Sequence, residues 1–157
     1  MLLDGFRWHE VVARHGPTAV WRGEHAATGL PVALKRLPAH ADPLREVRAV
    51  AALDHPSVVD IVGYGRLDRD HDGATAGTPW FAMTWLPESF AGWAPASWEE
   101  VRPRLVNVLE GLADAHGAGL VHCDVKPANL LRNPYGQAVL ADFGIARRST
   151  EAMRPSG

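Results

Sequence analysis

The sequence predicts an α+β fold in which a strand-rich first half precedes a mainly helical second half. Three patterns indicate it: short apolar runs separated by turn signals, a long stretch of apolar residues at helical spacing, and a closing pair of short apolar runs. The chain has 157 residues, 46% of them hydrophobic, so it suits one domain or part of a larger one and can bury a core.

Three strands are expected first, because apolar runs alternate there with turns that contain glycine and proline. Their expected bounds are Trp8–Ala13, Ala19–Glu24 and Pro31–Leu37. A helix should follow, with Asp42 as its cap and Pro43 in its first turn. The apolar stripe of this helix consists of Leu44, Val47, Val50 and Ala51.

A further strand pair is expected at Val58–Tyr64 and Trp80–Leu86. The polar loop between these strands, residues 68–78, begins like a calcium-binding loop, but the twelfth position is Pro79 instead of glutamate. A solvated hairpin loop is therefore favoured over a calcium site.

A long helix is expected from about Ser97 to His116, where Ser97 and Glu100 have the spacing of a capping box. Its buried face should carry Leu105, Leu109, Leu112 and Ala113. Pro103 should either kink this helix or mark its true start. Short strands around residues 130–131 and 139–140 should follow, and the polar tail 147–157 is expected to be loose.

Composition excludes several classes of function. The net charge is −2 with both signs interspersed, so neither a nucleic-acid footprint nor a basic membrane patch is expected. The chain has 1 cysteine, which rules out an internal disulfide and favours the reducing cytoplasm. The first ten residues lack a long apolar run and are not expected to form a signal peptide, and no window of the sequence is apolar enough to predict a span of a bilayer.

Three short motifs carry the chemistry. The most informative is the run HCDVKPANLL at residues 122–131, which places an aspartate, a lysine and an asparagine on one loop after a helix. The tripeptide Asp-Phe-Gly follows at 142–144, and Val-Ala-Leu-Lys stands upstream at 32–35. In this order the motifs closely resemble the eukaryotic-type, bacterial Hanks-type serine/threonine protein kinase family, whose parts the roles below follow.

The resemblance implies ATP-dependent transfer of the γ-phosphate to serine or threonine hydroxyls of proteins. Asp124 matches the residue that accepts or orients the hydroxyl proton, and Lys126 the residue that reaches the transferring phosphate. Lys35 matches the lysine that grips the α- and β-phosphates, with Glu46 as its ion-pair partner. Lys126, two residues after the aspartate, favours serine and threonine over tyrosine as acceptors.

The cofactors that the resemblance implies are ATP and Mg²⁺. Asn129 and Asp142 match the two oxygen donors to magnesium, a hard cation that prefers such ligands. The residues expected around the adenine are Val20, Ala33, the gatekeeper Met83, the hinge residues Thr84 and Leu86, and Leu131. Taken alone, each of these is better explained as an ordinary core residue, and only the catalytic framework favours the functional interpretation.

The family architecture implies two parts for this chain. Residues 1–86 would form a complete small N-lobe, with an antiparallel sheet, one helix and the hinge at its end. Residues 87–157 would form only the first part of the helical C-lobe and stop inside the activation segment. The helices that follow in the family provide the platform for protein substrates, so apolar faces that pack on them should be exposed here.

Two features of the sequence, the phosphate-binding loop and the residue before the catalytic aspartate, depart from the family pattern. The three glycines of the phosphate-binding loop should fall at Ala13, His15 and Thr18, and the loop retains only Gly16 beside a proline. Because glycines let backbone amides approach phosphates closely, this loop should grip phosphates poorly unless Lys35 and magnesium compensate. Cys123 replaces the arginine that precedes the catalytic aspartate, and is expected to be a small buried residue rather than a reactive thiol.

Other functions stay open at this point. The degraded loop motivates a non-catalytic, pseudokinase-like module that binds nucleotide or protein, or a truncated product without its own function. A small-molecule phosphotransferase of the aminoglycoside-kinase type shares a His-x-Asp loop. The Asp-Phe-Gly tripeptide and the Lys126-Pro127 pair argue against this last class.

Overall fold

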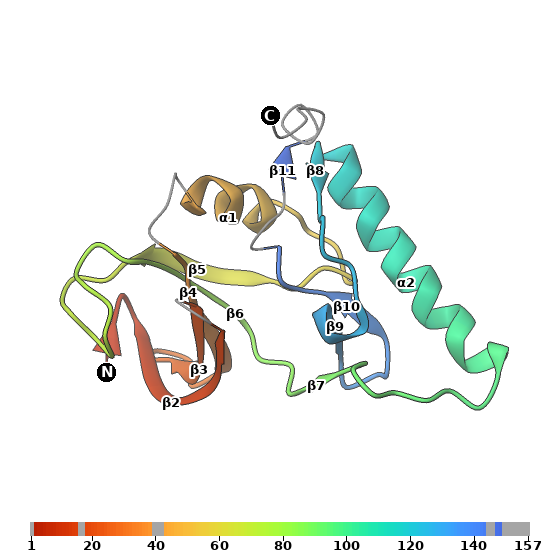
Figure 1. Cartoon of the computed structure of the whole chain (residues 1–157), viewed down its shortest axis with the longest axis horizontal. Helices are drawn as coiled ribbons and strands as arrows, with labels where there is room; N and C mark the ends of the chain where they lie inside the picture. The colour runs from red at the N-terminus through yellow and green to blue at the C-terminus, as the bar shows by residue number, and fades with distance from the viewer. Residues whose placement is uncertain (1, 16–17, 39–42, 144–146, 149–157) are drawn as a thin grey trace. The chain divides into compact units, whose positions relative to one another are not determined.

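The computed structural model describes residues 2–15, 18–38, 43–143 and 147–148, which fall into two compact units (Figure 1). The first unit comprises Met1–Arg48 and Asp60–Trp85, and the second comprises Ala49–Val59 and Leu86–Gly157. A sheet dominates the first unit and a long helix the second, so the predicted α+β class is confirmed.

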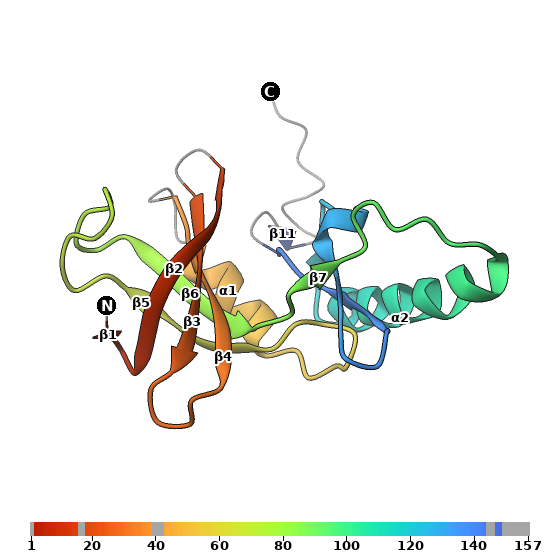
Figure 2. The ribbon, with the colours of Figure 1, turned by 90° about the horizontal axis from the view of Figure 1, so that it is seen from below.

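The first unit is built on a six-stranded antiparallel sheet of order β1-β2-β3-β4-β6-β5. Its strands are β1 (Leu2–Leu3), β2 (Phe6–His15), β3 (Thr18–His25), β4 (Pro31–Arg36), β5 (Ile61–Arg66) and β6 (Pro79–Thr84). Strands β2, β3 and β4 follow one another as two hairpins (Figure 2). The three strands expected at the start of the chain are therefore present, and the first is longer than predicted.

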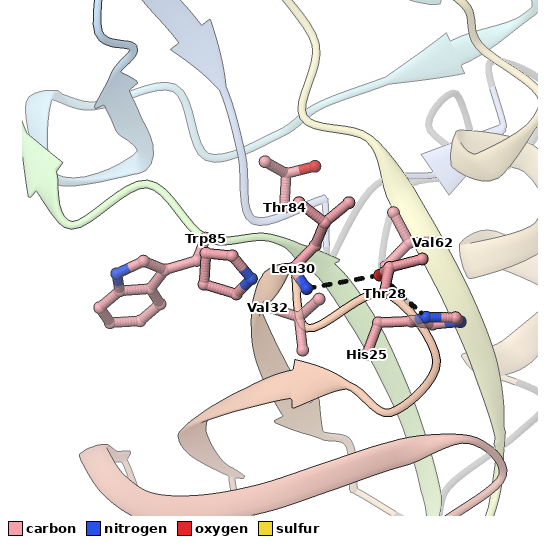
Figure 3. A pocket seen from close by; sticks show the side chains of 8 residues that line it. His25, Thr28, Leu30, Val32, Val62, Thr84 and Trp85 are labelled. Atoms are coloured by element: carbon pink, nitrogen blue, oxygen red, sulfur yellow. Dashed lines mark hydrogen bonds between the residues drawn. The ribbon is translucent and has the colours of Figure 1, made fainter.

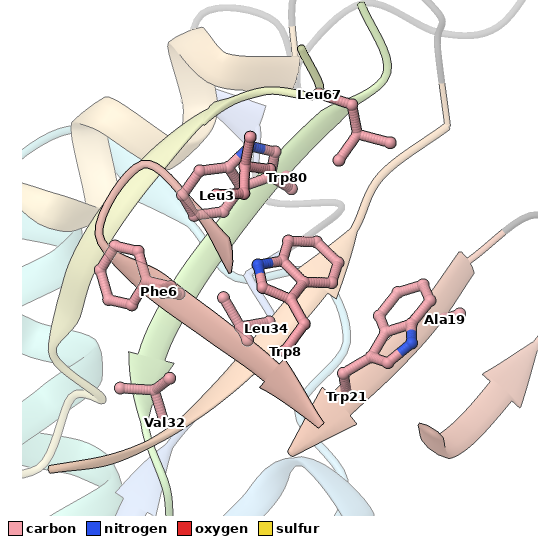
Figure 4. Close-up of a cluster of buried hydrophobic side chains, with 10 residues drawn as sticks. Leu3, Phe6, Trp8, Ala19, Trp21, Val32, Leu34, Leu67 and Trp80 are labelled. Atoms are coloured by element: carbon pink, nitrogen blue, oxygen red, sulfur yellow. The ribbon is translucent and has the colours of Figure 1, made fainter. Parts of the chain in front are cut away.

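One face of this sheet, here called the core face, buries a cluster of aromatic side chains (Figure 4). The ring centroids of Trp8 and Trp21 lie 5.0 Å apart, and Trp80 lies 5.8 Å from Trp8 and 5.7 Å from Phe6. Leu34, whose side chain is fully buried, fills the space between them. Such aromatic packing contributes both buried area and preferred ring geometry to stability.

Helix α1 (Pro43–Ala51) has the predicted stripe, with Leu44, Val47 and Val50 all buried. The predicted cap Asp42 lies outside the described residues. The strand expected at Val58–Tyr64 begins only at Ile61, so this prediction was wrong at its start. Val58 and Val59 instead contact Leu140 in the second unit, through a parallel bridge and a 2.9 Å backbone hydrogen bond.

The second unit combines helix α2 (Trp98–Gly117) with short strands. These are β7 (Glu88–Ser89), β8 (Leu120–Val121), β9 (Leu130–Arg132), β10 (Ala138–Leu140) and β11 (Arg147–Arg148). Strands β10, β9 and β7 form one small sheet, and β11 pairs with β8. The expected strands around 130–131 and 139–140 are confirmed, whereas most of the tail 147–157 lies outside the described residues.

The buried face of α2 differs from the prediction. Val108, Gly111 and Ala115 are buried, whereas Leu109 is 63% exposed and Leu105 is also exposed. The helix has apolar residues on two faces, and the face with small residues packs inward because it allows close approach to the neighbouring backbone. A Cβ at Gly111 would lie only 2.8 Å from the carbonyl oxygen of Ser57.

The start of α2 corrects the predicted capping box and decides between the two alternatives for Pro103. Ser97 is the N-cap, but its side chain makes no capping hydrogen bond, and Glu100 accepts instead from the amide of Ala96 at 3.1 Å. The predicted capping box is therefore absent. Pro103 lies inside the helix rather than at its start, where its ring nitrogen costs one helical hydrogen bond.

The close approach at Gly111 predicts a stability effect. Gly111→Ala should destabilise the chain by about 1–3 kcal/mol, because the added methyl would overlap Ser57 and the Leu140 side chain. Gly117→Ala is the matched control in the same helix, since nothing lies within 4 Å of a Cβ there. Thermal unfolding of both variants measures the difference; equal midpoints would show that the contact at Gly111 relaxes freely.

Candidate functional site

Four of the predicted site residues share the other face of the sheet in the first unit, here called the site face. Val20 in β3 pairs directly with Lys35 in β4, and Ala33 in β4 pairs directly with Met83 in β6. Paired residues, and residues two apart on a strand, point to the same side of a sheet. The strand register therefore brings Val20, Ala33, Lys35 and Met83 together.

Lys35 is the charged member of this group. Its residue is only 9% exposed, and its cross-strand neighbours on the site face are Val20 and Phe81. An ammonium group in such a setting is a localised charge with limited solvation, suited to binding an anion. Its predicted partner Glu46 belongs to α1, but the Glu46 side chain lies outside what the structure describes.

The predicted hinge follows at the end of β6. Thr84 pairs with Val32, so its side chain lies on the core face, and its amide donates to the carbonyl of Asp60 at 3.0 Å. The amide of Trp85 donates to Pro31 at 3.3 Å. These two amides are thus engaged in hydrogen bonds within the first unit.

A pocket of about 430 Å³ lies beside the hinge within the first unit (Figure 3). Its lining includes Val32, Val62, Thr84 and Trp85, and His25 Nδ1 lies 3.1 Å from the hydroxyl of Thr28 at its edge. Thr84 is the only predicted nucleotide-binding residue among those that line it. Because Val32 points away from the site face, this pocket is separate from the predicted adenine site, and no sequence motif indicated it.

In the second unit, the loop after β8 brings together two predicted catalytic residues and one predicted magnesium ligand. Lys126 Nζ lies 2.7 Å from Asp124 Oδ2, and Asn129 Nδ2 donates both to this oxygen and to the Asp124 carbonyl at 2.8 Å. A 3₁₀ turn, Pro127–Asn129, sets the spacing, and Asn129 is buried. The loop is therefore ordered by contacts among its own functional groups.

These contacts shift the pKa values of Asp124 and Lys126 so that both side chains favour their charged forms. The hydrogen bond from Lys126 lowers the pKa of the Asp124 carboxyl below its ordinary value, and the bond from Asn129 lowers it further. The same contact with Asp124 raises the pKa of the Lys126 ammonium. At neutral pH the loop thus presents a carboxylate and an ammonium group.

The segment that contains Asp142 is attached to this loop. His122, which is buried, contacts the carbonyl of Ala141 through Nε2 at 2.9 Å, and the Ala141 amide donates to Asn129 at 3.0 Å. The rings of His122 and Phe143 lie 4.4 Å apart. The two polar contacts of Ala141 and the packing of Phe143 against His122 therefore hold Asp142, which lies between these residues, next to the catalytic loop.

Two residues here have left-handed backbone conformations, Cys123 with φ 65° and Asp142 with φ 62°. Non-glycine residues adopt this region at a cost and are enriched at functional sites. Cys123 is exposed, so the expectation that it is a small buried core residue was wrong. Its side chain turns outward and contacts the Val121 carbonyl, because the loop uses its neighbours for internal bonds.

The donor set at Asn129 and Asp142 fits a magnesium ion. Both hydrogen bonds of Asn129 use its amide nitrogen, so neither occupies its side-chain oxygen. The carboxyl group of Asp142 would supply the second oxygen, and hard cations take such ligands together with phosphate oxygens. No group of three or more histidine, cysteine, aspartate or glutamate side chains forms a metal cluster within the described ranges.

The remaining predicted residues lie in the second unit. Leu131 is a half-buried member of β9 and pairs with Val139, and Leu86 precedes β7. Gly144, the end of the Asp-Phe-Gly motif, lies outside the described residues, as does the tip of the β2–β3 hairpin at 16–17. None of the helices in the described segments has the length and apolar character needed to cross a membrane.

A profile of the protein kinase domain matches residues 16–155. Serine/threonine-protein kinase PknA of Mycobacterium tuberculosis is 32% identical over 152 residues, which cover 90% of this chain and 35% of PknA. A probable serine/threonine-protein kinase of Streptomyces coelicolor is 31% identical over 160 residues, covering 94% of this chain and 23% of the relative.

A third relative, serine/threonine-protein kinase PknK of Mycobacterium tuberculosis, is 33% identical over 154 residues, covering 94% of this chain and 14% of PknK. The chain therefore spans only 35%, 23% and 14% of the lengths of these three relatives. The similarity extends over almost the whole of this chain.

Proposed function

Because the chain belongs to the protein kinase family, which confirms the resemblance in its motifs, we propose that it carries the nucleotide site and catalytic loop of a bacterial serine/threonine protein kinase. The reaction is transfer of the γ-phosphate of ATP to a serine or threonine hydroxyl of a protein in the cytoplasm. The observation that supports it best is the bonded set Asp124, Lys126 and Asn129.

Asp124 has the proton-handling role in this proposal. Its carboxylate accepts or orients the proton of the acceptor hydroxyl as the hydroxyl oxygen bonds to the γ-phosphorus. The lowered pKa keeps this carboxylate ionised at neutral pH. Lys126, whose pKa is raised, stays protonated and stabilises negative charge on the transferring phosphoryl group while the bond to ADP breaks.

Asn129 and Asp142 would hold Mg²⁺, which supplies neutralisation of the phosphate oxygens when it is bound. Lys35 would bind the α- and β-phosphates from the site face, with Glu46 as its partner. Val20, Ala33 and Met83, which share the site face of the first unit, would contact the adenine, and Leu131 would contribute a further apolar contact. Backbone groups of Thr84 and Leu86 would bind the base edge.

A non-catalytic nucleotide- or protein-binding module is the second candidate. The observation that favours it is the β2–β3 hairpin, in which paired strands continue to His15 and Thr18 with no glycine at the three expected positions. Side chains there limit how closely backbone amides approach phosphates.

Labelled ATP, magnesium and a generic basic protein substrate distinguish the two candidates. The kinase proposal predicts transfer to the substrate that Asp142→Ala abolishes, because the variant loses a magnesium ligand. Nucleotide binding without transfer above this variant would support the non-catalytic module. If the unmodified chain bound no nucleotide in the presence of magnesium, both the kinase proposal and a nucleotide-binding module would be contradicted.

A further inference from the structure

The loop between β5 and β6, residues 67–78, is a built structure rather than a solvated connection. His71 and Ala74 exchange two backbone hydrogen bonds of 2.8 and 2.9 Å around a tight turn, in which Asp72 and Gly73 have left-handed conformations. The side chain of Asp70 accepts from the amide of Ala76 at 2.8 Å. The expected hairpin loop is present, but it has a defined shape of its own.

This loop packs against the core face of the sheet. The ring of His71 lies 6.0 Å from Trp8 and 6.2 Å from Trp21, at the edge of the aromatic cluster. The solvated character expected for the loop is therefore only partly correct. Asp68 and Asp70 bond to groups within the loop, and Asp72 bonds to Arg14 in β2.

A buried arginine joins the loop to β4. Arg36 is only 8% exposed, its guanidinium lies 5.2 Å from the centre of the Trp21 ring, and its Nη1 donates to the carbonyl of Asp72 at 2.9 Å. A second contact reaches the His71 carbonyl at 3.4 Å. Because a buried guanidinium must be hydrogen-bonded, the loop supplies the partners that allow this charge to lie there.

A second arginine joins the loop to β2. Arg14 Nη2 lies 2.5 Å from Asp72 Oδ2. Arg14 pairs with Ala19 in β3, and Ala19 pairs with Arg36 in β4, so the three residues form one row across the sheet. Asp72 therefore connects the outer strands of this row, through its carboxylate to Arg14 and through its carbonyl to Arg36.

This row lies directly beside the predicted phosphate-binding residues. Val20 and Lys35 are the chain neighbours of Ala19 and Arg36, and they point to the opposite, site face. We propose that loop 67–78 is a brace in which Arg14, Arg36 and Asp72 act as positioning residues, holding β2, β3 and β4 from behind so that Lys35 and the hairpin are set for nucleotide. This inference rests on the proposed function.

The brace would matter more in this chain because the β2–β3 hairpin lacks glycine at the three expected positions. A hairpin that cannot wrap closely around phosphates depends more on where its strands are held. Contacts from the core face fix that position without placing any group on the site face. The brace thus makes nucleotide affinity sensitive to residues that never touch the nucleotide.

The test uses the chain with Asp72→Asn, which removes the charge that pairs with Arg14. Asparagine tolerates the left-handed conformation, so the turn and the carbonyl bond to Arg36 are kept. Asp68→Asn is the matched control, because Asp68 is in the same loop and its carboxylate pairs with the neighbouring Arg69 rather than with Arg14. The readouts are the Kd of a magnesium-bound fluorescent ATP analogue and amide hydrogen exchange across residues 13–20.

Asp72→Asn should weaken analogue binding about two- to fivefold, the range expected for an exposed ion pair, and speed exchange in the hairpin relative to Asp68→Asn. Arg14→Gln should match it, and the double variant should be no worse than either single one. Equal affinity and exchange for Asp72→Asn and Asp68→Asn would overturn the brace. If the unmodified chain binds no analogue, the proposed function fails, and hydrogen exchange alone still decides whether the brace exists.

Discussion

Asp124→Asn should lower the rate of phosphoryl transfer by about 10²–10⁴-fold, the range for loss of a positioned proton acceptor. The amide is close in size to the carboxylate, so the loop should keep its shape. The hydrogen bond from Asn129 to the backbone carbonyl of residue 124 does not depend on the replaced group. The measurement is the transfer rate at saturating magnesium and ATP.

Nucleotide affinity separates this effect from a structural one. The substitution removes no group expected to touch ATP, so the Kd of the ATP analogue should change by less than about threefold. Loss of binding together with transfer would show that Asp124 supports the fold of the loop. Transfer at the unmodified rate would contradict its proposed role.

The dependence on pH follows from the charge of Asp124. The active form is the carboxylate, and the hydrogen bond from Lys126 lowers the pKa of this group. Asp124 therefore stays ionised, and able to accept a proton, at pH values below those at which an ordinary aspartate becomes protonated. Any stability that comes from the ionised pair is present above the ordinary pKa and disappears as pH falls through the lowered one. Lys126→Met would move the acidic limit of activity toward higher pH.

Lys35→Met should lower kcat/KM for ATP by about 10²–10³-fold, as expected when one fixed group that stabilises phosphate charge is removed. Methionine retains most of the apolar stem, so packing beside Val20 and Phe81 should persist. Lys35→Arg should restore little, because a planar guanidinium does not replace a compact ammonium group. Steady-state kinetics with varied ATP give the result.

Arg48→Met is the control for loss of a positive charge from the same unit. Arg48 is exposed on α1 and lies 5.8 Å from the centre of the Tyr64 ring, and no role in phosphate binding is predicted for it. Its kcat/KM should stay within about twofold of the unmodified chain, as for most surface changes. An equal loss in both variants would mean that overall charge, rather than Lys35, controls affinity.

Local patterns predicted much of the fold. Alternating runs predicted β2, β3 and β4, and antiparallel pairing then placed Val20 opposite Lys35. The motif also predicted the catalytic loop, because the short spacing between its residues determines which side chains come into contact. The bonds among Asp124, Lys126 and Asn129 are consistent with the role that the motif implies for each of them.

Non-local contacts explain most of what was missed. The inward face of α2 depends on how closely Gly111 approaches Ser57, which helical periodicity cannot reveal when two faces are apolar. The two-residue strand β7, Glu88–Ser89, has no strand-like composition and forms only by pairing with β9. The brace joins Asp72 to Arg14 across 58 positions of sequence, and only the folded chain brings them together.

The most direct test is a crystal structure of the chain with magnesium and a non-hydrolysable ATP analogue. We expect one nucleotide site, in which Lys35 Nζ lies about 3 Å from the oxygens of the α- or β-phosphate. Magnesium should lie about 2.1 Å from oxygens of Asn129 and Asp142. The carboxylate of Asp124 should face the γ-phosphate. The kinase assignment would be contradicted if Lys35 and Asp142 did not contact the same bound nucleotide and its magnesium ion, or if other residues held the magnesium.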